Sequence, residues 1–266
     1  MTPSTAPVSA VIPCFRCAGT IRRAVRSVAS QTLPPVELIL VDDASSDDTK
    51  AVLESLRNEY GSDWVKIIAL ASNLGAAAAR NAGWEQARGE YVALLDADDS
   101  WMPDKIERQY AFMQCHPEYQ ISGHREYYGD QAPERPANSR SKHSEIGRAR
   151  VLLKNPMVTP SFMFRRDLPL RFHAANRHME DQRFLQEAVY SGIRIAKIEE
   201  ILAIIHKPAY GTSGLSAALW PMEQGELANY KALRDAGHLG RIQYALLTTY
   251  SLAKHCRRLI ATRLRR

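Results

Sequence analysis

Three aspartates, Asp96, Asp98 and Asp99, stand within four residues, directly after the apolar stretch 91–95. Carboxylates this close together repel one another unless a cation neutralises them. Oxygen ligands at this density suit Mg²⁺ or Mn²⁺, which also bind substrate phosphates. The alternative is a solvated acidic turn that caps the next helix, and the cluster alone does not decide between the two.

Two further acidic pairs could do chemistry. Asp42 and Asp43 follow the apolar stretch 37–41, where Asp42 could accept hydrogen bonds from a base or a ribose. Glu180 and Asp181 open a helix expected over about 180–191, and Asp181 could serve there as a general base. Each pair has a structural alternative, because acidic residues commonly form turns and cap first helical turns.

The elements that must position these residues alternate along the first half of the chain. Strands are expected over 8–13, 37–41, 65–70 and 91–95, with helices between them, the third over 76–88. This spacing predicts an α/β fold with a mostly parallel central sheet flanked by helices. Ligands bind such sheets at the carboxyl ends of the strands, where the acidic residues stand. The pattern weakens after residue 125: 129–144 reads as a loop, strands are expected within 161–164 and 193–205, and helices from 219 onward.

Composition and charge exclude several classes of protein. The chain has 266 residues, 45% of them hydrophobic, and a net charge of +6. It has no apolar run long enough to span a membrane and no secretory signal pattern, so we expect a cytoplasmic protein. Residues 241–266 hold seven basic side chains and no acidic one, which leaves 28 basic against 29 acidic in the other 240. A basic groove for nucleic acid is therefore not expected on the main domain.

The basic C-terminal segment forms an amphipathic pattern. Residues such as Ile242, Leu246, Ala253 and Cys256 fall on one helical stripe, and basic residues lie roughly opposite. The helix could pack on the domain with a solvated basic face. It could instead make a peripheral contact with anionic lipid at the inner face of the plasma membrane.

Two long segments resemble the nucleotide-sugar half of bacterial family 2 glycosyltransferases with the GT-A fold. They read VIPCFRCAGTIRRAVRSVASQTLPPVELILVDDASSDDT and NLGAAAARNAGWEQARGEYVALLDADDSWMPDKI. The resemblance is close from residue 8 to about 117 and looser to about 216. It implies a nucleotide-sugar-binding half over 1–117, an acceptor and catalytic half over 118–218, and a helical extension over 219–266.

The resemblance also implies roles for individual residues in an inverting transfer from a nucleotide diphosphate sugar, usually UDP-linked. Asp181 is the implied catalytic base and Glu180 its neighbour. The implied donor contacts are Pro13, Phe15, Asp42, Arg80, Asp96 and Lys207. The implied ligands of Mn²⁺ or Mg²⁺ are Asp98, Asp96 and His206. The acceptor would be a glycan or a lipid-linked hydroxyl compound in cell-surface glycan synthesis, and Trp101 could stack on a sugar ring.

Other functions remain as alternatives. A nucleotidyltransferase could also use aspartates and metal at strand ends, and a non-catalytic sugar-nucleotide-binding module would not need Asp181. A dehydrogenase is disfavoured because no G-x-G-x-x-G follows the first strand. Cys14 and Cys17 form a C-x-x-C, for which redox chemistry, metal binding or two reduced thiols could be considered. No second cysteine pair could complete a zinc site, and two reduced thiols are the favoured interpretation.

Overall fold

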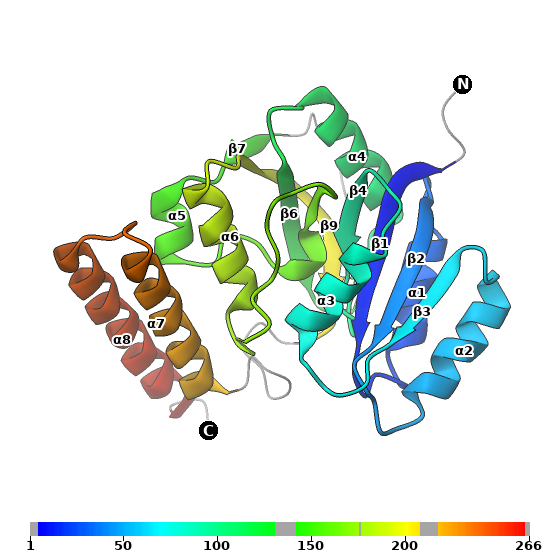
Figure 1. The fold of residues 1–266 in the computed structure, drawn as a ribbon, viewed down its shortest axis with the longest axis horizontal. Helices are drawn as coiled ribbons and strands as arrows, with labels where there is room; N and C mark the ends of the chain where they lie inside the picture. Colours follow the sequence, from blue (N-terminus) through cyan, green and yellow to red (C-terminus); the bar gives the residue numbers. More distant parts are fainter. Residues whose placement is uncertain (1–4, 131–141, 176, 208–217, 264–266) are drawn as a thin grey trace.

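The computed structural model describes residues 5–130, 142–175, 177–207 and 218–263, with side chains up to residue 259. In the first half strands and helices alternate as the sequence predicts (Figure 1). Their order is β1 (Ala6–Cys14), α1 (Ile21–Ala29), β2 (Pro35–Asp42), α2 (Thr49–Tyr60), β3 (Val65–Ala69), α3 (Ala76–Glu85) and β4 (Tyr91–Leu94). Helix α3 ends earlier than expected, because the amides of Arg88 and Gly89 donate to side chains of the sheet, Glu37 and Ser9.

The second half is less regular. It contains β5 (Ser100–Trp101), α4 (Lys105–Cys115), β6 (Ile121–Tyr128), β7 (His143–Glu145), α5 (Arg148–Leu153), β8 (Met163–Arg165), α6 (Glu180–Tyr190), β9 (Ile195–Ile205), α7 (Leu219–Asp235) and α8 (Arg241–Arg263). The sequence did not predict β6. Most of the expected loop 129–144 lies outside the described residues. The prediction that the loop continues to residue 144 is wrong, because His143 and Ser144 belong to β7, which pairs with β9.

One mixed sheet joins both halves. Its order is β3-β2-β1-β4-β8-β6-β9-β5, and β7 also pairs with β9. The pairs among β1, β2, β3 and β4 are parallel, as is β6 with β9, whereas β8 runs antiparallel to both its neighbours. The predicted α/β class with a mostly parallel sheet is confirmed, and the parallel strands direct their carboxyl ends to one edge.

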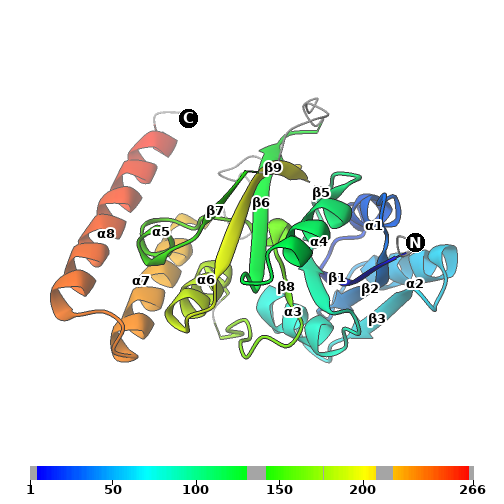
Figure 2. The same ribbon diagram turned by 90° about the horizontal axis from the view of Figure 1, so that it is seen from above.

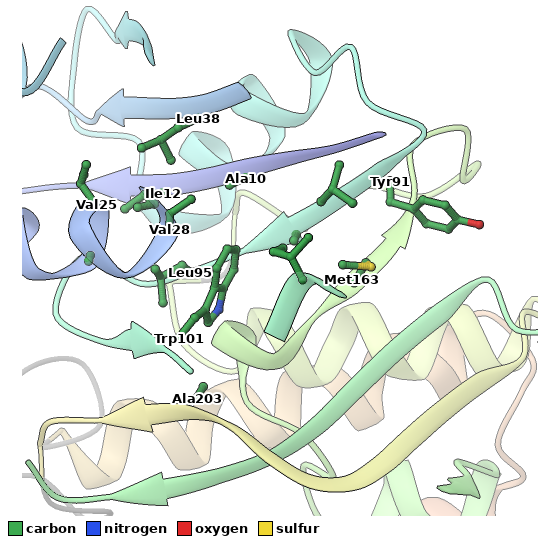
Figure 3. Close-up of a cluster of buried hydrophobic side chains, with 14 of the residues drawn as sticks. Ala10, Ile12, Val25, Val28, Leu38, Tyr91, Leu95, Trp101, Met163 and Ala203 are labelled. Carbon is green, nitrogen blue, oxygen red and sulfur yellow. The ribbon is translucent and has the colours of Figure 1, made fainter. Parts of the chain in front are cut away.

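The two faces of the sheet carry separate apolar cores. Successive residues of a strand point to opposite faces, so Ile12 packs with α1 and α4 while Val11 packs with α3 and α6. Figure 3 shows Trp101 inside the first of these cores, where its side chain is 3% exposed and its Nε1–H donates to the carbonyl of Pro160. The prediction that Trp101 stacks on a sugar is therefore wrong.

Helices α7 and α8 form an antiparallel pair at one end of the molecule (Figures 1 and 2). Helix α7 lies between α8 and α6, and α8 is outermost. Within the described residues, no helix combines the length and apolar character that a membrane span requires.

Candidate active site

A cleft of about 790 Å³ opens at the carboxyl ends of the parallel strands. One wall comes from the segments that follow β1, β2 and β4, and the other from 155–160 and the start of α6. The cleft brings together residues that are far apart in the sequence. The predicted site residues that line it are Pro13, Phe15, Arg80, Asp96, Asp98, Glu180, Asp181 and Lys207.

Backbone strain marks the same region. The non-glycine residues with positive φ in the described chain are Arg16 (48°), Ala44 (54°) and Met179 (60°). Arg16 follows β1, Ala44 follows β2 and Met179 precedes α6, so all three lie at or beside the cleft. Left-handed conformations cost L-residues about 1–3 kcal/mol and are typical of functional sites.

The aspartates after β4 are balanced by cations from other elements. The Asp96 carboxylate pairs with Arg80 at 3.0 Å, and Asp98 pairs with the Lys207 amine at 2.9 Å. Asp99 is buried beside the other two carboxylates, and burial followed by their repulsion raises its pKa to about 8. Asp99 is therefore the member of the cluster that most resists ionisation, while Asp96 and Asp98 each have a cationic partner.

Arg80 connects the two walls of the cleft. Its guanidinium donates to Asp96 on one wall and, at 2.9 Å, to Glu180 on the other. The Arg80 side chain is only 5% exposed, so both ion pairs are largely shielded from water. Removing one partner from a buried pair strands the other charge at a cost of about 3–5 kcal/mol. Arg80 therefore lines the cleft and also connects Asp96, after β4, with Glu180 of α6.

Asp181 sits in the first turn of α6 and is held by two donors. The Asn155 side-chain amide donates to its Oδ2 at 2.6 Å, and the Gln182 backbone N–H donates to its Oδ1 at 2.8 Å. Burial, and then repulsion from Glu180, raise the pKa of Asp181 to about 6, against the lowering effects of these donors and Arg80. A carboxylate with this pKa is ionised at pH 7 and is a stronger base than an ordinary aspartate.

Two predicted residues do not line the cleft. Asp42 is 4% exposed, and its Oδ1 accepts from the Ser45 amide. The ring of His206 contacts Ser100 through Nε2 at 2.8 Å and Asp130 through Nδ1 at 3.3 Å. Both ring nitrogens are engaged, so this arrangement offers no support for the predicted role of His206 as a metal ligand.

Asp43 lines the cleft in place of Asp42. Its carboxylate accepts hydrogen bonds from the side chain of Asn73 and from the amides of Leu74 and Gly75, at 2.7–3.0 Å. It thereby fixes the turn before α3. Strand β2 ends at Asp42, so Asp43 is the first residue of the following segment and turns toward the cleft with it.

Sequence reasoning also missed Asn155, which contacts Asp181. It lies where the resemblance is weakest, in a segment without a recognisable motif. Cys14 and Cys17 are buried free cysteines that line the cleft. Among the described residues, no group of three or more His, Cys, Asp and Glu side chains forms a ready metal cage.

Comparison with known proteins places the chain in a family. The model of "Glycosyl transferase family 2" matches residues 9–171, more than half of the chain. The chain belongs to glycosyltransferase family 2. The resemblance found in its motifs is thereby confirmed.

A curated relative and two solved structures resemble the chain. An Escherichia coli protein described as "UDP-Glc:alpha-D-GlcNAc-diphosphoundecaprenol beta-1,3-glucosyltransferase WfaP" is 38% identical over 109 residues, covering 40% of this chain and 41% of the relative. Matches to the first curated relatives span about two fifths of their length. The Staphylococcus aureus TarS fragment 1–349 with UDP-GlcNAc has a TM-score of 0.70 at 20% identity, covering 93% and 72% of the two chains.

The second structure is the Pyrobaculum calidifontis mannosyltransferase PcManGT in complex with GDP-Man and Mn²⁺. It has a TM-score of 0.67 at 17% identity and covers 94% of this chain and 74% of its own. These likenesses confirm the expected GT-A fold.

Proposed function

We propose that the chain is an inverting glycosyltransferase that moves a sugar from a UDP-sugar to a hydroxyl group of an acceptor. One observation carries this proposal: Arg80 joins Asp96 of the strand-end cluster to Glu180, the neighbour of Asp181, across a single cleft. A donor-binding wall and a basic carboxylate thus face the same space.

The donor would bind along the strand-end wall. Phe15 is 44% exposed there, beside Pro13, and offers a flat apolar surface to a base. Support for uridine comes from the UDP-sugars in the descriptions of WfaP and of the TarS complex. Asp42 stays a prediction as a base contact, and Asp43 contributes by holding the turn at 73–75.

Asp98 is the residue that fits a divalent ion. Its side chain is 43% exposed at the cleft and its present partner is a flexible lysine. A metal that a nucleotide diphosphate already holds needs only one or two protein carboxylates, so the lack of a ready cage among described residues is compatible with such a site. When bound there, Mn²⁺ or Mg²⁺ would offset the charge that develops on the departing diphosphate. Lys207 would then be free to pair with the phosphates.

Asp181 would take the proton from the acceptor hydroxyl as that oxygen attacks the anomeric carbon. Asn155 and the Gln182 amide orient its carboxylate, and Glu180 is fixed by Arg80. Inversion requires the base and the leaving diphosphate on opposite sides of the sugar. Asp181 and the strand-end aspartates reach the cleft from different elements, α6 and the segment after β4.

The acceptor would be lipid-linked and would serve cell-surface glycan synthesis. The description of WfaP names a diphosphoundecaprenol-linked sugar as what that relative acts on. Residues 118–218 would border the acceptor.

The test is a calorimetric titration with UDP and Mn²⁺, repeated with GDP and with EDTA, followed by measurement of UDP release from UDP-sugars. Metal-dependent binding of UDP over GDP and release of UDP are expected. Pyrophosphate release from UTP and a sugar phosphate would instead identify a nucleotidyltransferase. Tight UDP binding with no turnover, over a panel of UDP-sugars and glycan acceptors, would favour a binding module.

A further inference from the structure

Helix α8 has the reverse of the usual amphipathic orientation. Its polar side packs on α7: Ser251 and His255 are buried, and Lys254 and Arg258 point the same way. The apolar stripe that the sequence reveals lies on the outer side. The expectation of a solvated basic face on a packed helix is therefore wrong, because acidic residues of α7 bind that face.

Two buried glutamates of α7 fix this orientation. Glu223 is fully buried and accepts from Ser251 at 2.7 Å, with Arg258 at 3.7 Å. Glu226 is 3% exposed and accepts from Lys254 at 2.6 Å. Turning α8 to bury its apolar side would strand both carboxylates without their cations, at a high energetic cost.

The outer face of α8 is apolar and has a basic residue at each end along the helix axis. Ile242 is 78% exposed, Leu246 66% and Tyr250 44%. Arg241 and Arg257 are also exposed, and residues 241–266 contain no acidic side chain. Exposed apolar side chains gathered on one helix face mark an interaction site.

We propose that this outer face, carried by Ile242, Leu246 and Tyr250 and flanked by Arg241 and Arg257, docks on an anionic lipid surface. An apolar helix face with basic flanks matches the chemistry of a lipid headgroup layer. A second copy of the chain fits less well, because the two helices would bring only like charges together.

Helix α7, which packs on α8, also contacts the residues directly before α6, the helix that begins with Glu180 and Asp181. Asn229 of α7 donates to the carbonyl of Met179, and a Cβ on Gly225 would lie 2.7 Å from the carbonyl of His178. Met222 of the same helix lines the cleft. If the proposed function holds, a lipid-linked acceptor in that surface would meet the cleft beside its catalytic wall. The docking itself depends only on α8.

The experiment is co-sedimentation of the full chain with vesicles of phosphatidylglycerol or of phosphatidylcholine. The variant Ile242→Asp/Leu246→Asp changes the outer face only. The matched control Ala51→Asp/Asn58→Asp adds the same charge to exposed positions of α2, at the other end of the molecule (Figure 1). A second variant, Arg241→Glu/Arg257→Glu, removes the basic flanks and leaves the apolar residues in place.

We expect binding to phosphatidylglycerol that weakens with salt, falls at least tenfold in both α8 variants and persists in the control. Equal binding by the α8 variants, or no binding by the native chain, would overturn the inference. A native dimer that the Ile242→Asp/Leu246→Asp variant abolishes, without vesicle binding, would assign the face to a second copy. UDP titration of the native chain separates the two proposals: UDP binding without vesicle binding refutes docking alone, and vesicle binding without UDP binding refutes the transferase alone. The α8 variants should keep native UDP binding.

Discussion

Replacing Asp181 with Asn should inactivate the protein and stabilise it at the same time. Burial and the Glu180 charge raise the pKa of Asp181 from 3.8 to about 6, so the fold disfavours the ionised form that a base requires. Asparagine keeps the shape and can still bond to Asn155, but it carries no charge. Loss of a general base typically lowers the rate by about 10²–10⁴-fold.

The size of the stabilisation follows from proton linkage. A tenfold change in proton affinity corresponds to about 1.4 kcal/mol, so keeping Asp181 ionised in the folded state costs about 3 kcal/mol at most at pH 7.5. Because the pKa is raised by folding, this cost shrinks as the pH falls through 6 and vanishes well below 3.8, where the folded and unfolded chains both hold the proton. At pH 5 about half of it remains. For a chain of this size we expect Asp181→Asn to raise the Tm by several degrees at pH 7.5 and by less at pH 5.

The assay combines thermal unfolding at pH 5 and pH 7.5 with release of UDP. Asp167→Asn is the matched control, because the side chain of Asp167 is 83% exposed and lies outside the cleft. The control should keep both the native Tm and the native rate. An unchanged or lowered Tm at pH 7.5 for Asp181→Asn, or a rate near that of the native chain, would refute the assignment of Asp181 as a base with a raised pKa.

Three further predictions concern single side chains. Asp98→Ala should weaken UDP binding in Mn²⁺ by tenfold or more and change it little in EDTA, as measured by calorimetry; equal losses in both would argue against a metal at Asp98. Asn155→Ala removes a donor to the ionised Asp181, so the acidic limb of the pH–rate profile should move up from about pH 6 by about one pH unit; an unmoved limb would mean that Asn155 does not hold the base. Lys105 is fully buried over the Trp101 ring and its amine has no hydrogen-bond partner, so burial lowers the pKa of that amine. Lys105→Met should therefore raise the free energy of unfolding, and more so at lower pH, where the unfolded chain gains a proton that the folded chain resists; urea unfolding at two pH values tests this.

The sequence by itself determined the first half of the fold. Its strands are short apolar runs between helical periods, and local patterning of this kind sets strand and helix positions without knowledge of distant residues. The ends of the predicted strands then pointed to Asp96 and Asp98, which line the cleft. They also pointed to Asp42, whose neighbour Asp43 lines the cleft instead. Family motifs added Arg80 and the Glu180-Asp181 pair, although neither periodicity nor spacing showed that they meet.

Tertiary structure alone decided how charges pair across the fold. Arg80 meets Asp96 and Glu180 only because α3 and α6 pack on the same face of the sheet. Asn155 reaches Asp181 from a segment without any motif.

Helix α8 shows the same limit. Its amphipathic stripe is visible in the sequence, but which side faces the protein depends on Glu223 and Glu226 of another helix. Periodicity shows which residues share a face of the helix. Which face is buried depends on the charges of the helix that packs against it.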